Sequence, residues 1–443
     1  MRPKCSGFSS PLSANNPHRT PILAALYLGI AMLLVQAAAA QTFTVLYRFS
    51  SGVGGAIPSA GLTIDSRGNL YGTTLLGGVG SFYCFDYGCG TVFKLEHRDA
   101  GWVHIPIYKF HERPISYQDG ASPAARVIFG PDGALYGTTI IGGFGGLNGN
   151  GTIFRLAAAC HDDACPWIET RYDFPSDYSG GYAPQSGDLV FDSSGNLYGT
   201  TYLGGVGFCD NAPFSCGVAY EIPAPVQQWH ELVLYDFTQD SGFEPLAGAT
   251  VDGSGDFFGT ANAGGTADRG VVYRMTQSGG SWIQSVLYSF LGQDDGARPN
   301  AGLIRDSSGN LYGATVVAGA GGGGTVYELS PSGGSWTFSL IYSFSGSAGP
   351  AAALTMDAAG NLYGTTYGDG AYGFGNVFKL TKSNASWTYT SLYDFTGGDD
   401  GANPMSNVVF DSAGNLYGTT PYGGETERCF NGSGCGVVWE ITP

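Results

Sequence analysis

A seven-residue phrase, Gly-Asn-Leu-Tyr-Gly-Thr-Thr, occurs four times in the 443-residue chain, beginning at Gly68, Gly195, Gly360 and Gly414. Near copies bring the total to seven, and they begin at Gly133, Gly255 and Gly309. The central aromatic residues of successive copies are separated by 65, 62, 60, 54, 51 and 54 residues. A period of this length is typical of a repeat in which each unit is one four-stranded antiparallel sheet. This internal repeat overrides the expectation of about three domains that length alone would give.

Two other phrases accompany the first one, and each also occurs seven times. One ends in Tyr-x-Phe, as at Val45, and the other has the form Gly-Thr-Val-Phe-Lys-Leu, as at Gly90. We name four strands per repeat: strand a is the apolar stretch before an Asp, strand b the Leu-Tyr-Gly-Thr-Thr phrase, strand c the Gly-Thr-Val phrase, and strand d the Tyr-x-Phe segment. Strand a is apolar at nearly every residue, which predicts burial on both faces.

Sheets that are apolar on both faces must stack on one another. Seven of them stacked radially form a closed ring without long unpaired edges. The sequence therefore predicts an all-β fold over residues 41–443, a seven-bladed β-propeller of four-stranded antiparallel blades. The first strand, near Phe43, is of type d, and the last, from Gly436, is of type c. The ring is expected to close by pairing the N-terminal strand with the C-terminal blade.

The segment before each strand b has the composition of a hairpin turn. In the first repeat, Asp65 precedes Gly68 and Asn69. An aspartate in such a turn accepts hydrogen bonds from backbone amides, and glycine readily adopts positive φ. A repeated aspartate could instead be a calcium ligand, but the turn cap is the preferred interpretation.

Strand b itself is expected to hold neighbouring blades together. Leu70 and Tyr71 should point to opposite faces and pack against the two adjacent blades. Gly72 should leave room for an aromatic ring from a neighbour.

The N-terminus has the pattern of an export signal. Arg2, Lys4 and Arg19 precede an apolar stretch, and small residues end at Ala40. This arrangement predicts a signal peptide over residues 1–40, cleaved after Ala40, although a retained membrane anchor is the alternative. Localisation is therefore predicted to be secreted or extracellular, with cell-surface association left open.

Net charge excludes one class of partner. The chain has a formal net charge of −17, and loss of the three basic residues before position 41 changes it to −20. So acidic a chain repels nucleic acid and anionic lipid surfaces. No stretch of the mature chain is long and apolar enough to span a membrane.

Eight of the nine cysteines follow position 40 and fall into close pairs: Cys84/Cys89, Cys160/Cys165, Cys209/Cys216 and Cys429/Cys435. Even, close pairing predicts local disulfides formed in an oxidising compartment. Zinc is the alternative, but it prefers cysteine pairs that come together in fours, and these pairs lie in different repeats.

In antiparallel blades, the d–a and b–c connections emerge on one face of the ring. This loop-rich face is the expected recognition surface because its loops are long and variable. Its d–a loops also carry acids, at Asp119, Asp240, Asp294, Asp295, Asp399 and Asp400. Grouped carboxylates can hold calcium, so the last five are low-priority calcium candidates, while solvated Asp-Gly turns are the preferred interpretation. No other cofactor is expected.

The residues near the start of strand a lie closest to the axis, where propeller enzymes gather ionisable side chains. Most are small here, and the polar ones are Arg126, Asp188, Asn300 and Asn407. They form neither a carboxylate pair nor a metal triad nor an arginine cluster. No catalytic residue is predicted, and the balance is against an enzyme.

Repeats that combine Asp-Ser-Ser-Gly-Asn-Leu-Tyr-Gly-Thr-Thr with Gly-Gly and Gly-Thr-Val-Tyr-Glu-Leu resemble the choice-of-anchor GloVer-type tandem-repeat proteins of bacteria. The resemblance covers residues 43–443. It implies an extracellular repeat protein without an established activity, often tethered by a C-terminal anchor module. This chain ends at Pro443 without an apolar tail or a basic cluster, so free secretion or another tether is expected.

Together these features predict an exported, monomeric, non-catalytic repeat protein that binds a protein or a glycan on its loop-rich face. Two alternatives stay open: a secreted carbohydrate-active hydrolase or lyase with a site on the same face, and a purely structural cell-surface protein.

Overall fold

The computed structural model describes residues 41–443 except 79–83, 85–86, 112–117, 144–148, 161–164, 176, 178–179, 186, 208, 210–215, 385, 426–428 and 430–431. The predicted signal peptide, residues 1–40, lies outside the described residues. Residues Thr42–Thr442 form one compact unit. No helix among the described residues is long and apolar enough to cross a membrane.

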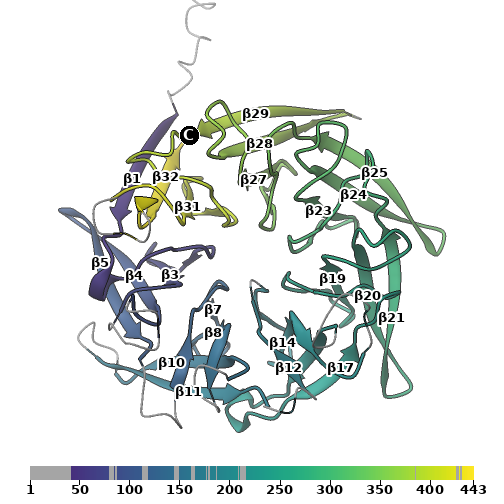
Figure 1. The fold of residues 1–443 in the computed structure, drawn as a ribbon, viewed down its shortest axis with the longest axis horizontal. Coiled ribbons are helices and arrows are strands. Elements are labelled where there is room, and N and C mark those ends of the chain that lie inside the picture. The colour runs from purple at the N-terminus through teal and green to yellow at the C-terminus, as the bar shows by residue number, and fades with distance from the viewer. Residues whose placement is uncertain are drawn as a thin grey trace, which may run out of the picture. The chain divides into compact units, whose positions relative to one another are not determined.

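Seven four-stranded antiparallel sheets surround a common axis, which confirms the predicted seven-bladed propeller (Figure 1). The innermost a strands of blades 1 to 7 are β2 (Thr63–Ile64), β7 (Ile128–Phe129), β13 (Val190–Phe191), β18 (Thr250–Val251), β22 (Ile304–Arg305), β26 (Thr355–Met356) and β30 (Val409–Phe410). The b strands are β3 (Leu70–Thr74), β8 (Leu135–Thr139), β14 (Leu197–Thr201), β19 (Phe257–Ala261), β23 (Leu311–Thr315), β27 (Leu362–Thr366) and β31 (Leu416–Thr420).

The outer half of each blade follows the same order. The c strands are β4 (Thr91–Arg98), β10 (Thr152–Ala158), β16 (Val218–Ile222), β20 (Val271–Ser278), β24 (Thr325–Ser332), β28 (Asn376–Ser383) and β32 (Val437–Thr442). The d strands are β5 (Gly101–Lys109), β11 (Trp167–Asp173), β17 (Leu232–Asp236), β21 (Ser281–Ser289), β25 (Ser335–Ser343), β29 (Ser386–Asp394) and, in blade 7, β1 (Thr42–Arg48). Short 3-10 helices include η1 (Gly52–Gly54) and η4 (Val226–Gln228).

Blade 7 closes the ring with strands from both ends of the unit, as predicted. Strand β1 pairs antiparallel with β32, so that Phe43 lies opposite Ile441. Figure 1 shows purple β1 beside yellow β32. Closure is reinforced where the Thr419 hydroxyl of blade 7 donates to the Ala60 carbonyl of blade 1 at 2.9 Å.

The same hydroxyl bond joins other blades. The first threonine of the Gly-Thr-Thr phrase donates to a carbonyl at the start of the next a strand, in the pairs Thr73–Ala125, Thr200–Ala247, Thr260–Ala301 and Thr365–Ser406. The phrase is thus repeated because it supplies a blade-to-blade contact as well as a strand.

Side chains of strand b pack as the sequence predicts. Leu70 is buried in a cluster that contains Tyr417 of blade 7. Tyr71 packs on blade 2, where its ring lies 5.3 Å from that of Phe129. Gly72 differs from the expectation, because a Cβ there would come within 2.6 Å of the Phe93 ring, which belongs to strand c of the same blade and not to a neighbouring blade.

The repeated aspartate is a turn cap, as preferred above. Asp65 accepts hydrogen bonds from the amides of Arg67 and Asn69 at 2.8 and 2.9 Å, and from the Tyr71 hydroxyl at 3.2 Å. The same three contacts recur around Asp192, Asp306, Asp357 and Asp411. Gly68 has φ +83°, which favours glycine at this point of the turn.

A second set of side chains seals the blades near the rim. We call it the outer inter-blade position: the d-strand residue that faces the last buried residue of strand c. Around blades 1 to 7 it holds His104, Glu169, Glu231, Gln284, Phe338, Tyr389 and Phe43, of which Glu231 stands one residue before its d strand begins.

Candidate binding site

The d–a and b–c loops lie on the same face of the ring, because they pair with each other within each blade. In blade 2, β6 (Gln118–Ala121) pairs with β9 (Ile141–Gly143), and in blade 3, β12 (Gly181–Tyr182) pairs with β15 (Leu203–Gly204). Isolated bridges repeat the arrangement in other blades, at Ala56–Leu76, Phe243–Ala263, Ala297–Val317 and Ala402–Tyr422. These loops together make up the loop-rich face.

Several non-glycine residues in the d–a loops of this face have a left-handed backbone conformation, with positive φ. The sequence analysis did not predict them. In six blades the residue before a proline has φ between 53° and 59°: Ile57, Ser122, Ala183, Glu244, Arg298 and Asn403. The Ile57 amide donates to Cys435 of blade 7 at 2.9 Å, and its carbonyl accepts from Leu75 of blade 1 at 3.1 Å. Positive φ is unfavourable for a β-branched residue, so these bonds between two blades hold it in place. The proline that follows each of these residues could have indicated their unusual backbone conformation, because proline disfavours the right-handed helical region for the residue before it.

A cavity of about 800 Å³ occupies the axis of the propeller. Seven of its lining residues stand at the same level. Each lies four positions before the aspartate that begins the a–b turn of its blade, or before Gly130, which takes the place of that aspartate in blade 2. They are Gly61, Arg126, Asp188, Gly248, Gly302, Ala353 and Asn407. We call them the axial ring. The cavity also reaches residues at the start of b–c loops, namely Leu75, Ile140 and Tyr422, so it extends to the loop-rich face.

Polar side chains occupy one arc of the axial ring. The Nε of Arg126 donates to Asp188 at 2.9 Å, and the Arg126 backbone amide donates to the same carboxylate at 3.1 Å. Between Arg126 and Asn407 stands Gly61, where a Cβ would fall 1.8 Å from the Asn407 Oδ1. The glycine therefore allows the Asn407 side chain to lie across blade 1 toward Arg126.

All four polar residues expected near the axis line this cavity: Arg126, Asp188, Asn300 and Asn407. Among the described lining residues, Asp188 is the single carboxylic acid and Arg126 the single base. Hydrolysis of a glycosidic bond by the common route uses two carboxyl groups. The described lining is better suited to hold a ligand through hydrogen bonds.

The five d–a loop aspartates considered as calcium candidates fall into two groups. Asp295 accepts from the Leu291 amide at 2.7 Å and the Tyr288 hydroxyl at 3.1 Å, and Asp400 accepts equivalent bonds from Thr396 and Tyr393. Burial and the neighbouring Asp295 carboxylate raise the pKa of Tyr288 to about 12. The second group, Asp240, Asp294 and Asp399, is exposed.

The capping acids thus use part of their acceptor capacity within their own loops, which reduces what they offer to a cation. Within the described parts of the chain, no three His, Cys, Asp or Glu residues converge in a way that could hold a metal. Calcium at these aspartates stays a prediction.

Four disulfides are present, joining Cys84–Cys89, Cys160–Cys165, Cys209–Cys216 and Cys429–Cys435, as predicted. Three close b–c loops on the loop-rich face, and Cys160–Cys165 closes the c–d turn of blade 2 on the other face.

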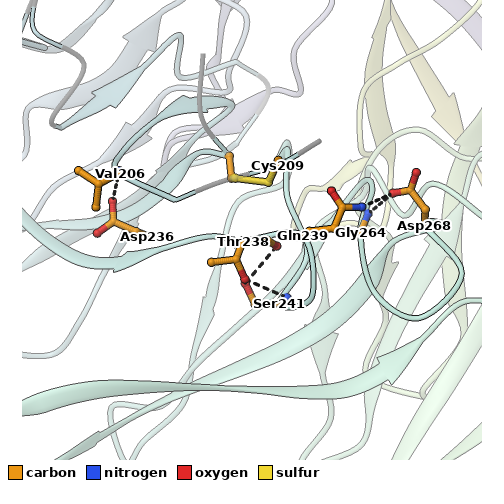
Figure 2. Close-up of a disulfide and its surroundings, with 9 residues drawn as sticks. Val206, Cys209, Asp236, Thr238, Gln239, Ser241, Gly264 and Asp268 are labelled. Atoms are coloured by element: carbon orange, nitrogen blue, oxygen red, sulfur yellow. Dashed lines mark hydrogen bonds between the residues drawn. A yellow bond between two sulfur atoms is a disulfide. The ribbon is translucent and has the colours of Figure 1, made fainter. Parts of the chain in front are cut away.

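Figure 2 shows the Cys209–Cys216 bond next to the loops of blade 4. There the Gln239 side chain donates to Asp268 at 3.2 Å, and the Gly264 amide donates to the same carboxylate at 2.9 Å. Asp268 therefore ties the d–a loop of blade 4 to its b–c loop.

Large apolar side chains are exposed on the loop-rich face. They comprise Val53, Tyr87, Val206, Leu291, Tyr372, Phe374 and Met405. A second exposed set lies on or beside the outer d strands and comprises Ile168, Leu232, Val233, Ile283, Val286 and Leu340. Both sets are available for contact, and Met405 of the first set also lines the axial cavity.

The repeat identified in the sequence matches a known family model. The model of the Gloeobacter/Verrucomicrobia repeat matches residues 33–208, 83–305 and 207–432, which together span most of the chain. The chain belongs to this family. The Gloeobacter/Verrucomicrobia repeat accordingly corresponds to propeller blades in this structure, and the expected resemblance to GloVer-type proteins is confirmed.

Similar solved structures share the fold of this Gloeobacter/Verrucomicrobia repeat protein. One is the extracellular domain of the putative one component system BT4673 from B. thetaiotaomicron, with 10% identity, a TM-score of 0.54 and coverage of 90% of this chain and 40% of that one. Another, described as a putative hybrid two component system, gives 11% identity, a TM-score of 0.53, and 90% and 39% coverage. The chain thus spans about 40% of the length of these relatives. No curated protein is significantly similar to it in sequence.

Proposed function

We propose that this protein is an exported, non-catalytic binding protein that holds a protein or a glycan on its loop-rich face. One observation carries the proposal: exposed apolar side chains, Tyr372 and Phe374 among them, stand on loops of the same face to which the axial cavity extends. Exposed aromatic residues on variable loops over a rigid scaffold are typical of recognition surfaces.

Export is part of this proposal. Residues 1–40 have the pattern of a cleaved signal peptide, and four disulfides suit an oxidising compartment. The mature chain would act as a monomer, with residues 41–443 as its single domain.

The test compares binding by two matched double variants. The purified protein is applied to a glycan array and to a panel of extracellular bacterial proteins. The change Tyr372→Ala with Phe374→Ala should abolish binding, because it removes both exposed rings from the blade 6 loop. The control, Ile283→Ala with Leu340→Ala, removes comparable apolar surface from the outer strands and should leave binding intact.

Three outcomes would overturn the proposal. Loss of binding in the outer-strand control alone would move the interface to the rim. Release of reducing ends from a glycan that the protein contacts would favour the carbohydrate-active enzyme. Absence of any binding by the parent would favour a structural role.

A further inference from the structure

We propose that the axial cavity is itself a binding site, for a neutral polyhydroxylated ligand of one or two sugar units. The axial ring is asymmetric: Asn407, Arg126 and Asp188 supply polar side chains on one arc, while Gly248, Gly302 and Ala353 leave the opposite arc bare. This inference goes beyond the proposed function, because it concerns the axis and holds whether or not the outer loops bind a partner.

The bare arc provides the space. Gly248 and Gly302 have no side chain and Ala353 has only a methyl group, so these three blades place at most a methyl group at this level of the axis. Small side chains on three successive blades therefore keep one side of the axis open. The resulting volume, about 800 Å³, lies within the range of pockets that enclose small molecules.

The polar arc provides unused hydrogen-bonding groups. Among the described residues, the guanidinium of Arg126 bonds only through Nε to Asp188, and the amide of Asn407 has no hydrogen-bond partner. On the opposite side, nearer the loop-rich face, the Oδ1 of Asn300 is buried without a partner. A buried acceptor without a donor is unfavourable, and a ligand hydroxyl would relieve this cost.

The charges select a neutral ligand. Arg126 and Asp188 neutralise each other, and among the described lining residues they are the only side chains charged at neutral pH. An anion would approach an acidic chain, of formal net charge −17, with no unpaired cation to meet it, and a cation would compete with Arg126 for Asp188. A hydroxyl both donates and accepts, so a polyol matches guanidinium, carboxylate and amide groups at once.

Apolar lining residues complete the match. Ile57, Leu75 and Met405 stand on the part of the wall nearest the loop-rich face. They can cover the C–H faces of a sugar ring while its hydroxyls reach the polar arc.

The experiment measures binding by ligand-observed NMR and calorimetry. The probes are glucose, galactose, xylose and cellobiose, with glucuronate and glucosamine as charged counterparts. At least one neutral sugar should bind with a Kd of about 1 mM or below. Arg126→Met and Asn300→Leu should each weaken that sugar about tenfold, because each removes hydrogen bonds without removing bulk. Arg67→Gln, in an exposed a–b turn on the other face, is the matched control and should bind like the parent.

A cavity-filling variant keeps the test informative if Arg126→Met or Asn300→Leu fails to fold. Ala353→Leu adds bulk on the bare arc, away from the ion pair, and should abolish sugar binding while the thermal melt still shows a folded protein. Tyr372→Ala with Phe374→Ala should leave axial binding unchanged, which separates this site from the loop-rich face. The inference is overturned if no neutral sugar binds at about 10 mM, if a charged probe binds more tightly, or if Ala353→Leu binds like the parent.

Discussion

The two halves of the propeller are sealed differently at the outer inter-blade position. Between blades 4 and 7, aromatic rings stack across each interface, with centroid distances of 4.4 Å for Tyr288–Phe338, 4.5 Å for Tyr342–Tyr389 and 3.6 Å for Tyr393–Phe43. Between blades 7 and 3, the same position holds His104, Glu169 and Glu231. One half is therefore closed by groups without charge, and the other by groups that titrate.

Burial has opposite effects on the pKa of the acidic and basic members of the second half. It lowers the pKa of His104, stacked on Tyr47 at 4.2 Å, to about 4. It raises the pKa of Glu169 to about 7, against the smaller opposing effect of Arg171. It also raises the pKa of Glu231, which accepts a hydrogen bond from Tyr172 at 2.8 Å.

The comparison teaches that equivalent interfaces in one ring can respond differently to pH. The aromatic half should be equally stable across the physiological range, whereas the titratable half should weaken at either extreme. The changes described next test this difference.

The largest effect should come from deleting residues 41–50, which contribute to both halves. The deletion removes Phe43 from the aromatic stack with Tyr393 and removes Tyr47 from His104. It also exposes the edge of β32. The free energy of unfolding should fall by several kcal/mol, with a drop in Tm of roughly 10 °C or more in calorimetry. A truncated protein that melts like the parent would show that β1 is dispensable for closure.

Phe43→Ala tests the aromatic half alone. Loss of the ring should cost about 3 kcal/mol in urea unfolding, because the stack with Tyr393 and the contact with Trp439 disappear. The cost should be the same at pH 5 and pH 8, since no group in this contact titrates in that range. Thr44→Ala, at an exposed neighbour, is the control and should change stability by less than about 0.5 kcal/mol. A strongly pH-dependent cost would erase the distinction between the halves.

Glu169→Gln tests the alkaline side of the titratable half. The folded-state pKa is about 7, above the usual 4.5, so Glu169 contributes its full stability below pH 4.5 and loses it as the pH rises through 7. The parent should lose up to ~3 kcal/mol between pH 4.5 and 8, and the variant should lose less. Urea unfolding across this range measures the difference.

Gln284→Glu is the converse change, because Gln284 holds the same position in blade 4. It should introduce a new alkaline loss of stability. Equal pH profiles for the parent and both variants would mean that Glu169 is ionised in the folded protein without penalty.

His104→Phe tests the acid side. The folded-state pKa of about 4 lies below the usual 6.5, so the stabilising contribution is present above pH 6.5 and is lost as the pH falls through 4. The parent should therefore lose about 2 kcal/mol between pH 7 and pH 4 that the variant retains, because phenylalanine gives this interface the type of residue found at Phe338. Thermal melts at pH 7, 5 and 4 should diverge progressively; parallel curves would contradict the assignment.

The smallest effect should be the same in both halves. Thr365→Ala removes a 2.7 Å bond to Ser406 at an aromatic interface, and Thr419→Ala removes a 2.9 Å bond to Ala60 at the His104 interface. Each should cost about 1 kcal/mol in urea unfolding, since each leaves a buried carbonyl without its donor. A cost at one interface but not the other would show that the outer position also governs the inner contacts.

Most of the fold could be predicted because every blade repeats the same turn and strand sequence motifs. Asp65 with Gly68 specifies a turn, and alternation at Leu70 and Tyr71 assigns faces to the blades on each side. The polar residues at the axis, Arg126, Asp188, Asn300 and Asn407, were expected from their place near the start of strand a. The close cysteine spacing likewise allowed only short loops to be bridged.

Two kinds of feature could not be predicted: the register between strands c and d, and the hydrogen bonds that the loop aspartates accept. Counting four residues back from the d-strand tyrosine finds His104 correctly, but in blade 2 it points to exposed Ile168 rather than to Glu169. The reason is that the β10–β11 pair lacks the bulge found in blade 1, so its register differs by one residue. The bonds of Asp295 within its own loop were equally invisible, because they depend on the path of the backbone.

The pairing of β1 with β32 also has a consequence in time. Strand β1 is the first strand to be synthesised and its partner is the last, so that nearly the whole chain must be made before the two can meet. At about 5–20 residues per second, the wait is on the order of half a minute. For that interval the earliest strand has an open edge and no correct neighbour to accept it. Six blades can form as their strands are completed, but the ring exists only after the last of them, which makes a prematurely terminated chain a candidate for aggregation rather than a smaller propeller.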